Sequence, residues 1–328
     1  MPVVSIIMPM YNAERFVTAA LASLLQEQTI PIEVIVVDDG STDASCKRVK
    51  QMQDDRILLL HSPHQGTANT LNLALSAVQG EIVMRCDADD RFPPHRIAEQ
   101  VEWLTQHPEY GAVCGSFTTM DVNEQEILAF NCGNESMDIT AELQQGITRA
   151  HLGTFAIRRE VLQTIGGCRS YFRSGEDIDV QLRIAEVCRV WYQPASRYQY
   201  RLHATSLTHT LNSEERNFFD KIAREFRHQR AAQGTDALQQ GCPPIPPKGT
   251  HVLDANQHIQ GLLLGKSWHE HSTGQKLKAI MTGLQSIGVR PQGLAAWRNL
   301  LVLLLKSPGQ KRVVPWEAGQ FQAFYEER

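Results

Sequence analysis

The first 117 residues alternate short apolar runs with longer amphipathic stretches, and this alternation limits the possible folds more than any other feature of the chain. The apolar runs predict strands at Val3–Met8, Glu33–Val37, Arg56–Leu60, Glu81–Arg85 and Ala112–Phe117. The stretches between them predict helices at about Ala13–Gln28, Asp43–Gln53, Gly66–Val78 and His95–His107. Strands that alternate with helices in this way form a mainly parallel sheet built from βαβ units. The sequence therefore predicts a doubly wound α/β domain.

The pattern is less regular after this region. Residues 118–147 are predicted to be irregular. Residues 151–166 predict a strand followed by a helix, and residues 176–187 predict one further helix.

The last third of the chain has a different character. Helical patterns dominate after Thr210, beginning with residues 214–233. Four prolines within residues 242–247 predict a stiff, extended connector. We therefore predict an α/β domain over residues 1–210 and a helical C-terminal extension over residues 211–328.

Composition excludes several classes of protein. A hydrophobic fraction of 42% with 21% charged residues is ordinary for a globular chain of 328 residues. The seven cysteines include no Cys-x-x-Cys pair, so neither a disulfide framework nor a zinc knot is indicated. The N-terminus has no basic segment typical of a secretory signal, and no uncharged apolar run approaches the roughly 18 to 20 residues that span a bilayer. We expect a cytoplasmic protein.

The C-terminal region is basic, whereas the rest of the chain is acidic. Residues 248–328 contain ten Lys and Arg against five Asp and Glu, which leaves 22 against 31 for the remainder. Residues 295–305 are mostly apolar and carry one charge, at Arg298. Such a helix either lies in the interface of a membrane, at the inner face of the cytoplasmic membrane, or packs on the α/β domain or in a homodimer.

Acidic residues follow two of the predicted strands. Asp87, Asp89 and Asp90 come directly after the fourth strand, and Asp38 and Asp39 follow the second. The carboxyl ends of parallel strands meet at the edge of the sheet where ligands bind. Crowded carboxylates repel one another unless a cation lies between them, and a hard divalent ion that also neutralises a phosphate meets this need. The alternative is a solvated acidic turn, in which Asp90 caps the following helix.

Other residues offer contacts for a ligand. Asp39 is expected to have a free carboxylate that accepts an N–H from a ligand base, and Tyr11 offers a ring for stacking. Arg169, Arg173 and Arg201 are candidates for clamping a phosphate or an acceptor, because guanidinium binds such groups bidentately.

Five motifs occur in an order that is similar to that of the family 2 glycosyltransferases with the GT-A fold. These are Pro9-x-Tyr11-Asn12, the run from Val36 to Asp43, the segment Gly66-x-x-Asn69 with Ala74 and Gly80-Glu81, the run Asp87-Ala88-Asp89-Asp90, and Gly175-Glu176-Asp177-x-Asp179. The resemblance covers about residues 3–209, and several ordered motifs are more specific than any single one.

The resemblance implies a role for each matching residue. In such enzymes the residues at the positions of Pro9, Tyr11 and Asp39 hold the nucleobase, and the acid at the position of Asp87 lies near the uridine ribose. The segment Tyr200–Thr208 resembles a late loop of the family, in which a histidine, here His203, often approaches the metal. The remaining roles are metal binding by Asp89 together with His203, and general-base catalysis by Asp177 with Glu176 beside it.

The resemblance also implies an activity. It indicates an inverting transferase that uses Mn²⁺ or Mg²⁺ and moves a hexose or N-acetylhexosamine from a UDP-sugar to a glycan or lipid-linked acceptor. Such a reaction belongs to the biosynthesis of surface polysaccharide or lipopolysaccharide in the cell envelope. The competing interpretation is a catalytically inactive protein of the same fold that binds a sugar nucleotide or acts as a scaffold. A dinucleotide-dependent oxidoreductase is excluded because no Gly-x-Gly-x-x-Gly occurs.

Overall fold

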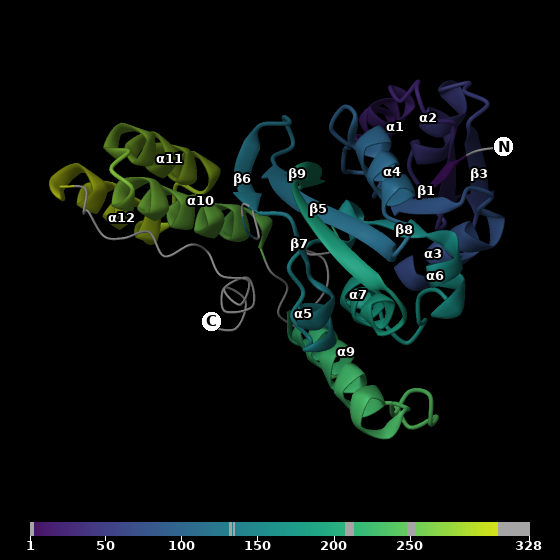
Figure 1. The fold of residues 1–328 in the computed structure, drawn as a ribbon. Coiled ribbons are helices and arrows are strands. Elements are labelled where there is room, and N and C mark those ends of the chain that lie inside the picture. The colour runs from purple at the N-terminus through teal and green to yellow at the C-terminus, as the bar shows by residue number, and fades with distance from the viewer. Residues whose placement is uncertain (1–2, 131–132, 134, 207–212, 248–253, 308–328) are drawn as a thin grey trace.

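A computed structural model describes residues 3–130, 133, 135–206, 213–247 and 254–307. Within these residues, nine strands form one mixed sheet (Figure 1). Its order is β3 (Ile57–His61), β2 (Ile32–Asp38), β1 (Val4–Met10), β4 (Ile82–Arg85), β8 (Ala156–Arg158), β5 (Tyr110–Met120), β9 (Arg189–Arg201) and β7 (Met137–Asp138), with β6 (Glu126–Phe130) paired to β5. Strands β1 to β4 are mutually parallel, β5 is parallel to β9, and β8 runs antiparallel between β4 and β5.

Helices cover both faces of this sheet. One face packs against α1 (Val17–Leu25), α2 (Ser45–Gln51) and α4 (Arg96–Gln106), and the other against α3 (Thr67–Ala77), α6 (Arg159–Thr164) and α7 (Glu176–Val187). The side chains of Ile6 and Ile7 are both buried, but they belong to different cores, because successive residues of a strand point to opposite faces. This burial on both faces explains the near-continuous apolar runs of the central strands, and the doubly wound α/β prediction is confirmed.

The prediction that residues 118–147 are irregular is wrong. Strand β5 continues to Met120, and β6, β7 and a short helix, α5 (Thr140–Gln144), follow within this region. All eleven residues of β5 are buried, because β5 pairs with β8 and β6 as well as with β9.

Strand β9 was not predicted at all. Its sequence contains Pro194, which removes a backbone N–H and argues against a central strand. The ladder accommodates the proline through a register shift between Gly115 and Phe117, where the Ser116 hydroxyl donates a hydrogen bond of 2.6 Å to the Pro194 carbonyl.

The first helix beyond residue 210 packs on the α/β domain. In α9 (Ser213–Gln233), Phe219 and Phe226 are buried against Phe172, which precedes α7. Below these rings, buried ion pairs join Arg169 to Asp179 of α7 and to Asp236 in the turn after α9.

The three helices that the structure describes after α9 form a separate unit in Figure 1. They are α10 (Ala255–Ser272), α11 (Lys276–Val289) and α12 (Leu294–Leu305). Their contact with the sheet is a small apolar cluster in which Ile259 and Leu262 of α10 meet Ile127 of β6 and Leu202. Since α9 packs on α7, we propose that the independent helical unit begins after the connector at residues 242–247. None of the helices in the described part of the chain is both long and apolar enough to cross a membrane.

Candidate active site

The loop after β2 forms one wall of the site. The two carboxylate oxygens of Asp39 accept hydrogen bonds from the backbone N–H groups of Gln65 (2.8 Å) and Gly66 (2.9 Å), at the start of α3. Gly66 has φ +86°, a left-handed conformation that favours glycine. The expectation that Asp39 has a free carboxylate is therefore wrong, although each oxygen keeps a second lone pair.

An aromatic pair lies beside this carboxylate. The exposed ring of Tyr11, two residues after Pro9 of β1, lies 4.4 Å from the ring of His64, measured between centroids. Nδ1 of His64 is 2.9 Å from the backbone oxygen of Asp39. The structure thus brings Pro9, Tyr11 and Asp39 to one edge of the sheet, and His64 joins them without having been singled out in the sequence.

Arg85, the last residue of β4, connects two acidic motifs. Its guanidinium contacts Asp87 through two hydrogen bonds, from Nε (2.6 Å) and Nη2 (3.0 Å). Its Nη1 lies 3.2 Å from Oε1 of Glu176 in the first turn of α7. The arginine therefore holds Asp87 and Glu176 on the same side of the sheet, although they are far apart in the sequence. The sequence did contain a signal for this role of Arg85, because an arginine at the end of an apolar strand is followed closely by three acidic residues.

The first turn of α7 carries two acids in different environments. Glu176 is 5% exposed, and burial raises its pKa to about 7, with Arg85 opposing this shift and Asp177 adding to it. Asp177 is only half-buried. Gly175, the N-cap residue of this helix, has φ +72°, a left-handed conformation that favours glycine.

The charge of Asp177 acts on two further groups. Burial, followed by the charge of Asp177, raises the pKa of Asp220 of α9 to about 7. Burial lowers the pKa of His151, and the charges of Asp177 and Asp87 oppose that shift. The ring of His151 stacks on Tyr198, with 5.4 Å between centroids. No local pattern in the sequence indicated that His151 or Asp220 belongs to this site.

The two predicted metal ligands meet. Oδ2 of Asp89 lies 2.8 Å from Nε2 of His203, although 114 residues separate them in the sequence. The other ring nitrogen of His203 lies 2.9 Å from Oγ1 of Thr205, which fixes the orientation of the imidazole. The arrangement offers one carboxylate oxygen and one ring nitrogen at the mouth of the site.

Asp90 positions this pair and does not cap a helix, so the capping prediction is wrong. Its fully buried carboxylate accepts hydrogen bonds from the Tyr198 hydroxyl (2.5 Å) and from the backbone N–H of Arg201 (2.7 Å). Burial and the charges of Asp89 and Asp87 raise the pKa of Asp90. These contacts join the end of β9 to the loop after β4. His203 follows β9 and Asp89 lies in that loop, so the contacts bring the two side chains together.

Two of the three candidate phosphate clamps are structural. Arg201 is 1% exposed and donates to the backbone oxygens of Asp89 (2.7 Å) and Asp121 (3.1 Å). Arg169 is held in the ion pairs beneath α9. The exposed Arg173 lies 3.4 Å from Glu215 and keeps its candidate role as a prediction.

Comparison with known proteins identifies the family. The family model described as glycosyl transferase family 2 matches residues 5–166. EpsE of Bacillus subtilis, which is named as a glycosyltransferase, is 33% identical over 194 residues that make up 56% of this chain and 67% of that protein. The chain belongs to glycosyl transferase family 2. Chondroitin synthase of Pasteurella multocida is 24% identical over 234 residues, which are 70% of this chain but 24% of that larger protein.

Solved structures agree on the fold of this family 2 transferase. TarS 1-349 of S. aureus in complex with UDP-GlcNAc aligns with a TM-score of 0.57 at 16% identity, covering 92% of this chain and 79% of TarS 1-349. The mannosyltransferase PcManGT of Pyrobaculum calidifontis, in complex with GDP-Man and Mn²⁺, aligns with a TM-score of 0.51 at 20% identity, covering 99% and 84%. The GT-A fold and the glycosyltransferase class predicted from the motifs are confirmed.

Proposed function

We propose that this transferase moves a hexose or N-acetylhexosamine from a UDP-sugar to a hydroxyl of a glycan or lipid-linked acceptor, with inversion at the anomeric carbon. The Arg85 bridge carries the proposal. It holds Asp87, which we assign to the donor, next to Glu176, so the first turn of α7, which also carries Asp177, lies beside the loop after β4. The named ligand of TarS, UDP-GlcNAc, supports a UDP-sugar. The name of chondroitin synthase supports polysaccharide assembly as the setting.

The donor base would lie against the Tyr11–His64 pair. Uracil has a ring N–H that needs an acceptor, and the second lone pair of an Asp39 oxygen supplies one. Because backbone N–H groups already fix the Asp39 carboxylate, that acceptor is held in place before the nucleotide binds. Asp87, held by Arg85, is the neighbouring carboxylate on the ribose side.

Asp89 and His203 fit a divalent cation. A carboxylate oxygen with an imidazole nitrogen suits Mn²⁺ better than Mg²⁺, which prefers oxygen alone. When bound, the ion neutralises the charge that grows on the departing diphosphate. Asp90 and Arg201 keep the two ligands in register, because they fasten the end of β9 to the loop that bears Asp89.

Asp177 is the proposed general base. Glu176 is buried and occupied by Arg85, whereas Asp177, the next residue, is half-buried and reachable by an acceptor. A base on the face opposite the leaving group removes the acceptor's proton while its oxygen attacks the anomeric carbon, which inverts the configuration. Glu176 then acts as a positioning residue through Arg85.

Nucleotide-dependent stabilisation tests the donor assignment. Thermal unfolding would be followed with UDP, GDP and dTDP, each with and without Mn²⁺. A ligand at a hundred times its Kd stabilises the folded state by about 2.7 kcal/mol, which corresponds to several degrees in Tm. We expect the largest shift for UDP with Mn²⁺. An equal or larger shift for GDP would contradict the UDP assignment, and binding of UDP without transfer would favour the inactive sugar-nucleotide-binding alternative.

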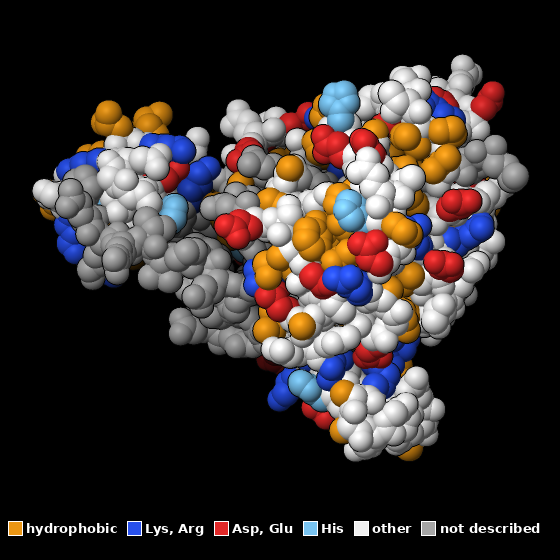
Figure 2. All heavy atoms as spheres, in the orientation of Figure 1, with side chains coloured by type: hydrophobic (Ala, Val, Ile, Leu, Met, Phe, Trp, Pro, Cys, Tyr) orange, Lys and Arg blue, Asp and Glu red, His pale blue; other side chains and the backbone are white. Residues whose placement is uncertain are grey.

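We also propose that the helical unit α10–α12 binds an anionic membrane surface, which would bring a lipid-linked acceptor to the site. Exposed apolar residues recur at helical spacing on α11 (Leu277, Met281, Leu284) and on α12 (Leu294, Trp297, Leu301, Leu304). Lys278, Arg298 and Lys306 are exposed beside these stripes. Figure 2 shows hydrophobic side chains projecting from this unit with Lys and Arg around them. Apolar stripes bordered by basic residues match lipid chains beneath acidic headgroups.

Leu301→Ser tests this surface. Burying a leucine contributes about 1.5–3 kcal/mol, so we expect at least roughly tenfold weaker binding to vesicles that contain phosphatidylglycerol. Ile245→Ser is the matched control, because Ile245 is also exposed but lies in the connector. Equal binding by both variants, or no binding by the parent protein, would contradict the proposal. A concentration-dependent increase in mass without vesicle binding would instead assign the stripes to a homodimer.

A further inference from the structure

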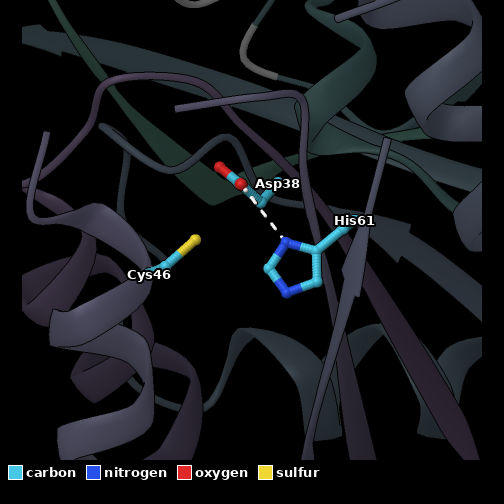
Figure 3. Close-up of side chains that lie close together, drawn as sticks. All are labelled: Asp38, Cys46 and His61. Carbon is cyan, nitrogen blue, oxygen red and sulfur yellow. Dashed lines mark hydrogen bonds and ion pairs between the residues drawn. The ribbon is translucent and has the colours of Figure 1, made fainter. Parts of the chain in front are cut away.

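Three potential metal ligands lie close together at the edge of the sheet (Figure 3). They are next to the proposed nucleobase wall, which is formed by Tyr11, Asp39 and His64. Asp38 ends β2, His61 ends β3, and Cys46 lies in the first turn of α2. The carboxylate oxygen, the ring nitrogen and the sulfur all lie within 4.8 Å of one another. Asp38 is buried, Cys46 is half-buried and His61 is exposed, so the cluster has one side open to solvent. None of the three has a role in the proposed transfer reaction.

The spacing of these atoms suits metal coordination. Nδ1 of His61 is 3.4 Å from Oδ2 of Asp38, which is long for an N–H···O hydrogen bond. In a tetrahedral zinc site with Zn–N and Zn–O bonds of about 2.0–2.2 Å, the two ligand atoms are themselves about 3.4 Å apart. A Zn–S bond of about 2.3 Å places the sulfur about 3.6 Å from each of them. Figure 3 shows the Cys46 sulfur directed toward the space between the other two side chains, so a small side-chain movement completes the geometry.

The donor atoms select the metal. Thiolate and imidazole suit Zn²⁺, whereas Mg²⁺ and Mn²⁺ favour oxygen ligands. We propose that Asp38, Cys46 and His61 bind one Zn²⁺, with water as the fourth ligand. This site is distinct from the pair Asp89 and His203.

Zinc binding displaces a proton from Cys46. Asp38 coordinates through a carboxylate oxygen and His61 through an unprotonated ring nitrogen, and the Cys46 thiol loses its proton to solvent as the Zn–S bond forms. Without metal, burial, together with the hydrogen bond to Asp38 and its charge, raises the pKa of Cys46 to about 11. The free cysteine is therefore a thiol at neutral pH, and the ion replaces its S–H···O contact with Asp38.

The position of the site suggests its effect. Asp38 directly precedes Asp39, and His61 lies four residues before Gln65, whose N–H binds the Asp39 carboxylate. A metal joining the ends of β2 and β3 would therefore restrain both loops that make the nucleobase wall. We expect it to stabilise this wall without taking part in the transfer itself.

Cobalt is the spectroscopic probe for this proposal, because Co²⁺ takes the place of Zn²⁺ in such sites. The full chain, stripped of metal, would be titrated with Co²⁺ and then with Zn²⁺. We expect visible bands of tetrahedral Co²⁺ and ultraviolet thiolate-to-cobalt absorption that saturate at one ion per chain and disappear when one equivalent of Zn²⁺ is added. The same absorption is expected in Asp89→Ala, which removes a ligand of the other site, so a failed donor-site assignment leaves this result unaffected.

Cysteine variants locate the site. Cys46→Ser should abolish the thiolate absorption, and His61→Ala should weaken binding at least tenfold. Cys242→Ser, which changes an exposed free cysteine, should leave the spectrum unchanged. Thermal unfolding without metal establishes that each variant is folded. A parent protein without thiolate absorption, or absorption that persists in Cys46→Ser, would overturn the proposal.

Discussion

Asp177→Asn is expected to lower the rate of sugar transfer by roughly 10²–10⁴-fold, because a positioned general base contributes about that much and an amide does not accept the acceptor's proton. The substitution preserves the shape of the side chain, and the neighbouring Glu176 stays paired with Arg85. We therefore expect the loss in kcat, with the UDP-dependent thermal shift of the parent protein retained. Single-turnover transfer from a labelled UDP-sugar measures this loss directly.

Asp55→Asn is the matched control for this experiment. Asp55 is an exposed carboxylate that precedes β3, at the opposite edge of the sheet from Asp177. The transfer activity of the Asp55→Asn variant should equal that of the parent protein. If Asp177→Asn kept more than about a tenth of the parent rate, another group would have to be the base, and Glu176→Gln would be the next variant to measure.

Asp89→Ala is expected to remove the metal-dependent part of donor binding and to lower kcat/KM on the order of 10³-fold. A metal ion contributes several kcal/mol to stabilisation of the leaving group, and each 1.36 kcal/mol corresponds to about a factor of ten in rate. Asp89 supplies the carboxylate that meets His203 at 2.8 Å. The measurements are the rate as a function of Mn²⁺ concentration and the UDP-dependent Tm with and without Mn²⁺.

The comparison with His203→Ala makes this prediction specific. If both residues hold one ion, each single variant loses most of the Mn²⁺ response, and the double variant loses little more, because the two act as a unit. Independent, additive losses would contradict a shared ion. UDP binding that persists without metal in Asp89→Ala is expected, since Asp39 and Tyr11 remain.

Much of the α/β domain could be predicted because its signals are local. The apolar runs of β1 and β2 and the acids that follow β2 and β4 lie next to one another in the chain, and parallel strands bring their carboxyl ends to one edge. The order of the motifs was enough to indicate the family. Among the missed strands, β9 lacks such a signal, since Pro194 interrupts it and its pairing partner is β5, some 80 residues earlier.

The hydrogen-bonding state of the site residues required the tertiary structure. Asp39 looks unpaired in the sequence, but its oxygens meet backbone N–H groups more than twenty residues away. Asp90 looks like a helix cap, but the nearest polar hydrogens come from Tyr198 and Arg201 of β9. Which donor reaches a carboxylate depends on how whole elements pack, and a local pattern does not contain that information.

The sequence by itself determined the class of fold, the edge of the sheet that carries the acids and the family, because strand periodicity, turn residues and motif order are properties of neighbouring positions. The tertiary structure alone decided that Arg85 joins Asp87 to Glu176, that Asp220 of α9 lies near Asp177, and that Asp38, Cys46 and His61 share one space. Each of these contacts joins residues from separate elements. Their distances are set by the packing of helices on the sheet, which many weak interactions along the whole chain determine together.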